Sequence, residues 1–493
     1  MIRILQIPLL CASTRALFGA VVACGLASVG GAAVVEPDYF GIEIPPNIAP
    51  LNLDVTGAER VRATMRAADG DSLAADGPEI RWPAKKWSAF LARHAGESYE
   101  LSLELDGKSA GVATNRISRF PIDSHLTYRL IRPGYSDFGV VGIWQRDLTA
   151  FAERPLYRNV QHAQKQCVNC HTYNASDPKT YLFHSRLERH GTQIVSPKYG
   201  RIRRDIRLPN GLACTYPAWH PSGDFIAFSA NETFQVFYEV SPERIEVADI
   251  RSDLLFYSLA DDRVIPVETE SHFLESFPAW DPAGLRLFTS RARLAPDDVR
   301  RREAGEFRDG NHVAFASITN LHYDLVVRTF DPERRTFSEP QILVDGIKSK
   351  RSVTFPRVSP DGRWLVMTVG PCGVFHIWHK SADLWILDLQ KGTTRSLDEL
   401  NGPNADSYHC FSKNGRWMVF SSRRDDGAYT RPYFAAFDPE TGRFSKPFLL
   451  PVENPSEHGR RMLSYNVPEF SAGAVEESPR DLHRLILAPT EKK

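Results

Sequence analysis

The 493-residue sequence lacks a net charge, because 60 lysine and arginine residues balance 60 aspartate and glutamate residues. Such a balance gives no general attraction to nucleic acid or to an anionic membrane surface, so no nucleic-acid partner is predicted. Beyond residue 35 the sequence also lacks an apolar run long enough to span a bilayer. It has no G-x-S-x-G, no phosphate-binding loop and no H-E-x-x-H, so the signatures of three widespread catalytic classes are absent.

Sulfur-containing residues are scarce, with seven cysteines and five methionines. Cys11 and Cys24 lie near the N-terminus, and two further cysteines belong to the motif described below. Cys214, Cys372 and Cys410 remain. One disulfide with one thiol, or three buried thiols, would both account for them, and the sequence does not assign a pairing.

The N-terminus has the features of an export signal. Arg3 and Arg15 precede an apolar run of small residues from Ala16 to Val35, and "GAA" at Gly31–Ala33 resembles a signal-peptidase site. "VVAC" at Val21–Cys24 resembles a lipoprotein box, and an uncleaved membrane anchor is the third interpretation. All three predict an exported protein, either periplasmic or attached to the membrane through its N-terminus and facing the periplasm.

Four segments of the chain repeat one pattern of an aromatic residue, a short apolar stretch, a turn that ends in glycine, and an alternating strand. They start at Tyr216, Phe277, Phe355 and Tyr408, and their turn glycines are Gly223, Gly284, Gly362 and Gly415. Glycine adopts the positive φ that tight hairpins require. Each segment therefore predicts two antiparallel strands joined by a tight turn.

Each repeat continues into a third strand, at Ser252, Tyr323, Ala382 and Arg431, and a less regular fourth. Four strands per unit are typical of β-propeller blades, so the predicted fold is all-β. Two strands in His125–Leu148 and two in Gly191–Leu208 predict another blade, and a strand near Met462 closes the ring, so that the terminal segments meet in one blade. Six blades fit best, and five or seven also fit.

These patterns predict four parts of the chain. Residues 1–33 form the signal peptide, lipoprotein leader or anchor, and residues 36–123 form a small β-rich domain with one helix that begins at Pro83. Residues 124–478 form the propeller, with an insertion at about 160–190, and residues 479–493 form a C-terminal tail.

The insertion contains "CVNCH", with Cys167, Cys170 and His171 in the spacing C-x-x-C-H. This spacing attaches a c-type haem in exported proteins, and its chance occurrence in this composition is roughly 0.003. The thiols add to the two haem vinyl groups, and the histidine reaches the iron. A structural zinc site needs a second ligand pair and a redox dithiol needs a thioredoxin-like setting, neither of which the sequence supplies. One covalent haem c is predicted, with a disulfide or another metal as the alternative.

The second axial ligand of such a haem is not obvious, because no methionine closely follows the motif. His184 is the first candidate and His190 the second, so His171 and His184 are the predicted iron ligands. Tyr173 either approaches the iron or packs on the haem. An iron with five ligands and an open position is the alternative. His376 and His379 lie three residues apart, so on a strand they would face opposite sides and would not share a metal.

Several segments resemble a bacterial family of exported TolB-like propellers that carry C-x-x-C-H. The resemblance rests on "IPPNIAPLNL" at Ile44, "CVNCHTY" at Cys167, "IWHKSADLWILDL" at Ile377 and "SSRRDDGAYTRPY" at Ser421. It implies a six-bladed TolB-like propeller and says little about activity. A propeller with this motif is also similar in architecture to the middle domain of the hydrazine synthase α-subunit, and such a likeness does not transfer function.

The function predicted from these features is electron transfer, or other haem-based redox chemistry, with a redox or scaffold partner protein. The first alternative is an interaction module for proteins or ligands whose haem or cysteine pair is structural. The second is a haem enzyme that acts at an open iron position.

Overall fold

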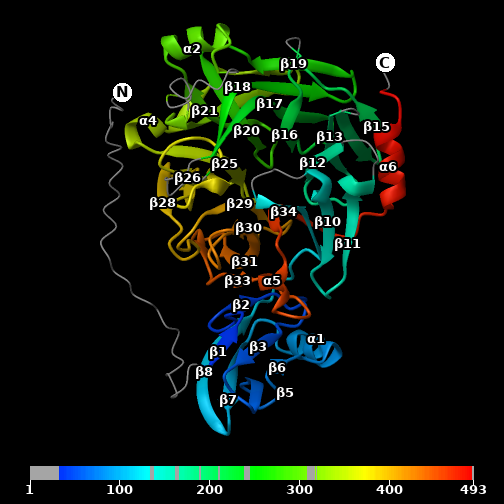
Figure 1. Cartoon of the computed structure of the whole chain (residues 1–493), viewed down its shortest axis with the longest axis vertical. Coiled ribbons are helices and arrows are strands. Elements are labelled where there is room, and N and C mark those ends of the chain that lie inside the picture. The colour runs from blue at the N-terminus through cyan, green and yellow to red at the C-terminus, as the bar shows by residue number, and fades with distance from the viewer. Residues whose placement is uncertain are drawn as a thin grey trace, which may run out of the picture.

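The computed structural model describes residues 33–490 except 134–137, 162–165, 188–189, 209–210, 238–244, 308–316 and 318. The leader predicted for residues 1–33 therefore lies outside the described residues, apart from Ala33. Within them, no helix is both long and apolar enough to cross a membrane. Figure 1 shows a large β-structure with a smaller domain at one end of its long axis.

Six sheets of the described residues make up the larger body. The first sheet contains β34 (Ser464–Ser471), β9 (His125–Ile131), β10 (Gly142–Asp147) and β11 (Glu153–Arg158), and the second contains β12 (Gln166–Tyr173), β13 (Tyr181–Leu187), β14 (Gly191–Ser196) and β15 (Gly200–Arg204). The third contains β16 (Cys214–Trp219), β17 (Phe225–Phe237), β18 (Ile245–Ser258) and β19 (Arg263–Glu268), and the fourth contains β20 (Phe273–Trp280), β21 (Arg286–Arg293), β22 (Asp324–Asp331), β23 (Thr336–Phe337) and β24 (Gln341–Val344). The fifth contains β25 (Ser352–Val358), β26 (Trp364–Gly370), β27 (Asp383–Asp388) and β28 (Thr393–Ser396), and the sixth contains β29 (Asp406–Phe411), β30 (Trp417–Ser422), β31 (Arg431–Asp438), β32 (Arg443–Phe444) and β33 (Phe448–Leu449). We number these sheets blades 1 to 6.

The first strand of each sheet contacts the first strand of the next. These contacts run from β34 through β12, β16, β20, β25 and β29, and β29 contacts β34 again. The sheets therefore form a closed ring, which leaves no free edge at the point of closure. Closure occurs in blade 1, where the C-terminal strand β34 pairs antiparallel with β9. The predicted propeller and its closing strand are confirmed.

The predicted turn glycines have the expected conformation, with φ of 74° at Gly223 and 70° at Gly284. At Gly284 a second constraint applies, because a Cβ atom there would lie 2.3 Å from Nε2 of His220. That ring nitrogen lies 2.9 Å from the carbonyl oxygen of Gly284, and Nδ1 lies 2.9 Å from Ser222 Oγ. His220 thus joins the turn of blade 3 to the turn of blade 4.

One predicted feature of the ring is wrong. The strands in His125–Leu148 and in Gly191–Leu208 do not share a blade, because they belong to blades 1 and 2 respectively. The residues assigned to an insertion at about 160–190 form β12 and β13, which pair with each other and then with β14. The motif segment is consequently part of the ring itself.

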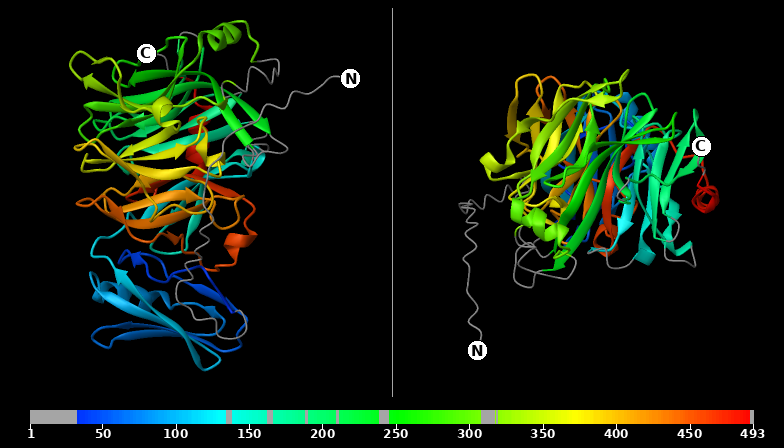
Figure 2. Two further views of the ribbon diagram at one scale, coloured as in Figure 1. Left: turned by 90° about the vertical axis from the view of Figure 1, so that its left-hand side faces the viewer. Right: turned by 90° about the horizontal axis from the view of Figure 1, so that it is seen from above.

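The N-terminal domain contains two sheets and one long helix. The strands are β1 (Val34–Glu36), β3 (Leu53–Thr56) and β6 (Glu79–Ile80) in one sheet, and β2 (Glu43–Ile44), β8 (Lys108–Ile117), β7 (Ser98–Leu105), β4 (Val61–Ala67) and β5 (Ser72–Asp76) in the other. Helix α1 (Ala84–Arg93) buries Trp87, Phe90 and Leu91. The domain packs on blade 6 in one continuous apolar core, and the left-hand view of Figure 2 shows it from a further side.

The remaining helices are short. They are η2 (Phe138–Val140), η3 (Asn159–Gln161), α2 (Pro296–Glu303), α4 (Gly346–Ser349), η4 (His376–Trp378), α5 (Glu457–Arg460) and α6 (Pro479–Leu487). The predicted C-terminal tail includes α6, which begins with a capping box at Ser478 and buries Leu482, Leu485 and Ile486. It contacts β11 and β15, and so covers the outer edges of blades 1 and 2 (Figure 1).

Candidate functional site

The C-x-x-C-H motif lies in β12, the innermost strand of blade 2. Its pairing with β13 shifts register between Asn169 and Thr172, where Cys170 and His171 form a bulge. Cys170 has a φ of 55°, which is unusual for a residue with a side chain. A bulge redirects side chains from the regular alternation of a strand, so the bulge decides where these two residues point.

The other five blades have the same bulge at the same place. The residues equivalent to Cys170 also have positive φ, and they are Tyr216, Phe277, Phe355, Tyr408 and Val467. The four aromatic rings of this set contact one another in sequence, with centroids 4.5 Å apart for Tyr216 and Phe277 and 4.8 Å apart for Phe277 and Phe355. Cys170 is therefore the sixth member of a set that lines the centre of the propeller.

His171 occupies the position that His409 occupies in blade 6. Nε2 of His409 lies 2.9 Å from the carbonyl oxygen of Val366, in the preceding blade. His171 likewise interacts with the backbone of Thr127 and Val467 in blade 1, its preceding blade. Burial and the positive charge of Arg129 lower the pKa of His171 to about 4. Both histidines thus connect neighbouring blades.

The space around His171 is small and apolar. It lies between blades 1 and 2, has a volume of about 10 Å³, and is lined by Tyr173, Tyr181 and Phe183 among others. A volume of that order holds at most about one water molecule. The Tyr173 hydroxyl lies 2.7 Å from Thr127 Oγ1, and burial raises its pKa. Tyr173 therefore packs between blades 1 and 2.

The two motif thiols lie away from this space. Cys167 pairs with Arg186 across the two strands, so both side chains project from the same face of blade 2. A guanidinium nitrogen of Arg186 lies 3.6 Å from Cys170 Sγ. All five cysteines of the described residues are thiols, so none of the three C-terminal ones forms the disulfide that the sequence left open.

His184 faces the opposite side from His171. It is 3% exposed, its ring packs 5.6 Å from Phe228 of blade 3, and Nδ1 lies 3.0 Å from Thr192 Oγ1. Burial and the charge of Arg186 lower its pKa to about 3. His190 lies at the rim of the same region, 3.3 Å from Asp205 Oδ2. The sheet of blade 2 separates His171 from His184, so the structure does not bring the two predicted iron ligands together.

The residues present fit a covalent haem only in part. Arg186, which contacts the Cys170 thiol and shares a face of the sheet with Cys167, lies with His184 on the side toward blade 3. His171 lies on the side toward blade 1. Nε2 of His171 has no hydrogen-bond partner among the described residues, as expected of a nitrogen that binds a metal. The surrounding space of about 10 Å³, however, leaves no room for a metal ion. Among the described residues no three metal-binding side chains cluster.

Two further polar groups could not be found from sequence spacing. The sequence predicts a strand at His376 and His379, but the chain forms the single turn η4 there. Their two rings are 5.3 Å apart. Nε2 of His379 lies 2.5 Å from Glu246 Oε2 of the long β17–β18 hairpin. This buried contact joins the hairpin to the loop before β27. No sequence pattern could have indicated this contact, because 133 residues separate His379 from Glu246.

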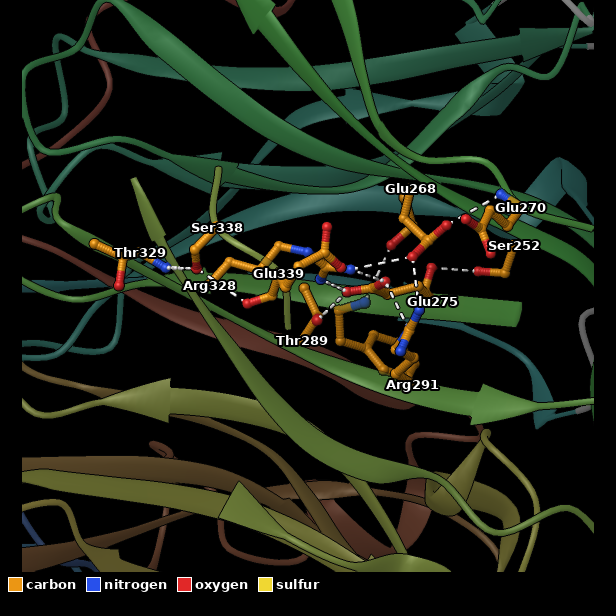
Figure 3. Close-up of polar contacts among 12 residues, drawn as sticks. Ser252, Glu268, Glu270, Glu275, Thr289, Arg291, Arg328, Thr329, Ser338 and Glu339 are labelled. Atoms are coloured by element: carbon orange, nitrogen blue, oxygen red, sulfur yellow. Dashed lines mark hydrogen bonds and ion pairs between the residues drawn. The ribbon is translucent and has the colours of Figure 1, made fainter. Parts of the chain in front are cut away.

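Blade 4 contains a buried ion-pair network, shown in Figure 3. Glu275 on β20 is fully buried, accepts hydrogen bonds from Thr289 and Arg328, and lies 3.6 Å from Arg291. Arg328 and Arg291 also contact Glu268 at the end of blade 3, at 3.3 Å and 2.7 Å. Each charge thus has a partner of opposite sign, which is what burial of ions requires.

The ring of sheets defines the protein as a β-propeller. No protein-family model matches the chain, and no curated protein matches it. Solved structures with some likeness include TolB from Acinetobacter baumannii, with 12% identity over 76% of this chain and 79% of that chain and a TM-score of 0.43. An oligogalacturonate lyase in complex with manganese has 11% identity over 67% and 75%, with a TM-score of 0.36. A nidogen–laminin complex has 10% identity over 70% and 97%, with a TM-score of 0.36. These likenesses carry no functional argument, and the fold assignment rests on the sheets.

Proposed function

We propose that this chain is an exported β-propeller that attaches one haem c through Cys167 and Cys170 and exchanges electrons with a partner protein. The observation that carries the proposal is the C-x-x-C-H spacing on the innermost strand of a blade, with Cys167 and Arg186 on one face. Arg186 beside Cys170 supports it further, because a guanidinium group matches the carboxylates of the haem propionates. When bound, the haem would supply one-electron chemistry.

The predicted leader agrees with this proposal, since haem attachment to C-x-x-C-H takes place after export. A periplasmic location, with or without membrane attachment through the N-terminus, follows from the same leader. The partner is a redox protein, or a scaffold that brings one close, because propellers commonly present a broad face to other proteins.

The test is production of the chain with and without a haem-attachment system, followed by haem staining of denaturing gels. We expect stain in wild-type protein, and none after Cys167→Ala combined with Cys170→Ala. Cys372→Ala is the matched control, because Cys372 lies outside the motif, and it should keep the stain. Absence of stain from wild-type protein matured in that system would remove the proposal.

A second function is favoured by a specific observation. His171 interacts with the backbone of the preceding blade, as His409 does, and Cys170 completes a set of six equivalent residues, so these two motif residues also have a structural explanation. The chain would then be an interaction module without haem. In that case, thermal stability and partner binding should be the same whether or not a haem-attachment system is present.

A further inference from the structure

A cavity of about 310 Å³ lies between blades 2 and 3. The residues that line it include His184, Arg186, Thr192, Cys214, Thr215 and Asn231. A volume of this size lies at the lower end of the range for small-molecule sites. The cavity therefore has room for a small organic molecule.

A chain of hydrogen bonds determines which nitrogen of His184 carries its proton. Cys214 has one S–H, and its sulfur donates to the carbonyl oxygen of Ile206 at 3.3 Å. The 3.5 Å contact between Thr192 Oγ1 and this sulfur must then use the threonine proton. Thr192 Oγ1, 3.0 Å from His184 Nδ1, is left as an acceptor, so the proton of the neutral ring is on Nδ1.

Nε2 of His184 is consequently a hydrogen-bond acceptor. It is buried and has no hydrogen-bond partner among the described residues. Leaving a buried acceptor unsatisfied is unfavourable, so a ligand that donates a hydrogen bond to it would be stabilised.

The lining also has a net positive charge. Arg186 and Arg207 supply two guanidinium groups, and Asp205 supplies one carboxylate, which accepts from Arg207 Nε at 2.7 Å. His190 lies 3.3 Å from the same carboxylate, at the rim. His184 is neutral at pH 7, since its pKa is lowered to about 3. A cation would be repelled from this cavity and an anion attracted.

We propose that this cavity binds a small organic carboxylate that carries a hydroxyl group. The carboxylate pairs with Arg186, and the hydroxyl donates to Nε2 of His184. This binding site uses neither motif thiol, but it shares Arg186 with the haem proposal, so it is tested on protein that carries no haem. A metal ion held by Nε2 is the competing occupant, and the lining charge argues against it.

The wild-type chain, produced without the haem-attachment system so that no haem propionate competes for Arg186, tests the proposal through a matched set of probes. Propionate lacks only the hydroxyl group of lactate, and lactamide lacks only its charge. In ligand-observed NMR titrations we expect lactate to bind about two- to tenfold more tightly than propionate and at least about tenfold more tightly than lactamide. Equal dissociation constants for the three probes, or no binding of any, would overturn the proposal, as would zinc binding with no lactate binding.

Two variants assign the contacts. His184→Phe keeps the ring that packs on Phe228 and removes the acceptor, so lactate and propionate should then bind equally. Arg186→Gln should weaken both acids at least about tenfold. Arg62→Gln, at an exposed arginine of the N-terminal domain, is the control and should change neither. If His184→Phe retains the preference for lactate, the role given to His184 is wrong.

Discussion

At the bulge of each innermost strand, one position holds proline in four blades and histidine in two. The prolines are Pro217, Pro278, Pro356 and Pro468, and the histidines are His171 and His409. Because four equivalent backbones accept proline, the residue at this position needs no N–H for the ring to fold. His171 is thus replaceable in the fold, whatever its role toward a cofactor.

A pair of substitutions tests this equivalence. We expect His171→Pro to retain the fold, with a change in unfolding free energy below about 1.5 kcal/mol, because the backbone is already suited to proline. His171→Asp should cost about 3 kcal/mol or more, since it buries a carboxylate in an apolar space. His409→Pro is the matched control. Urea denaturation followed by tryptophan fluorescence gives the comparison, and equal losses for Pro and Asp would contradict the equivalence.

A second residue-scale prediction concerns Asp249 on β18, which is 2% exposed. Burial raises the pKa of Asp249 from 3.8 to about 6, although Asn231 and Ser276 donate hydrogen bonds to it. The folded protein therefore holds this proton more tightly than the unfolded chain. The resulting stabilisation is full below about pH 3.8 and is lost as the pH rises through about 6.

Asp249→Asn isolates this contribution, because the amide keeps the shape and does not titrate. Relative to the variant, wild-type protein should lose up to about 3 kcal/mol of stability between pH 4 and pH 7. Melting temperatures of both proteins across that range provide the measurement. A difference that stays constant with pH would show that Asp249 does not titrate there.

At the scale of single elements, the ion-pair network of blade 4 connects three strands, β20, β21 and β22, to the end of β19 (Figure 3). Removing Arg328 leaves the buried carboxylate of Glu275 with a longer ion pair, to Arg291 at 3.6 Å, and so with weaker compensation of its charge. Arg328→Met should therefore cost about 3–5 kcal/mol, because Glu275 is fully buried.

The double variant Arg328→Met with Glu275→Leu should regain most of that loss, since two apolar side chains can replace a buried pair. Arg334→Met is the control, because Arg334 is 82% exposed and its ion pair contributes little. Denaturant unfolding of the four proteins measures these differences. A double variant less stable than Arg328→Met would show that the network stabilises through more than charge compensation.

At the scale of the whole molecule, closure of the ring depends on one strand. β34 pairs with β9 and contacts β12 and β29, so blades 1, 2 and 6 all pack against it. Truncation after residue 461 removes β34 and leaves the edge of β9 open. An open, apolar edge favours aggregation, so we expect little soluble monomer by size-exclusion chromatography.

Truncation after Ala488 is the control, because it keeps both β34 and α6. This shorter chain should elute as the full chain does, and its melting temperature should be nearly unchanged. A soluble, monomeric protein after truncation at 461 would mean that the ring holds together without the C-terminal strand.

Much of this architecture follows from local patterns. The aromatic residue, the proline and the turn glycine recur in the sequence because the bulge and the tight turn restrict φ at single positions, as at Phe277 and Gly284. Such restrictions act within a few residues, so they can be recognised in one repeat and compared with the next. The strands of blades 3 to 6, the turn glycines and the closing strand could all be predicted in this way.

The motif itself misled the sequence interpretation. Cys170 and His171 stand where blades 3, 4 and 5 have an aromatic residue and proline, so the repeat is not recognisable there and the sequence predicts an inserted loop in place of β12. Once β12 and β13 are strands, the following pair, β14 and β15, completes blade 2 rather than blade 1. The C-x-x-C-H motif thus occupies the positions at which the aromatic residue and proline would identify the repeat.

The sequence by itself determined the all-β repeat, the turns, and the C-x-x-C-H chemistry that makes a haem the proposed ligand. Only the tertiary structure decided that His171 faces blade 1, that His184 faces blade 3, and that Cys214 orients His184 across an interblade cavity. The physical reason is that a side chain's face depends on pairing register and on the bulge, and a cavity between blades is lined by residues from separate repeats. Spacing along the chain specifies neither the face on which a side chain lies nor the residues that line such a cavity.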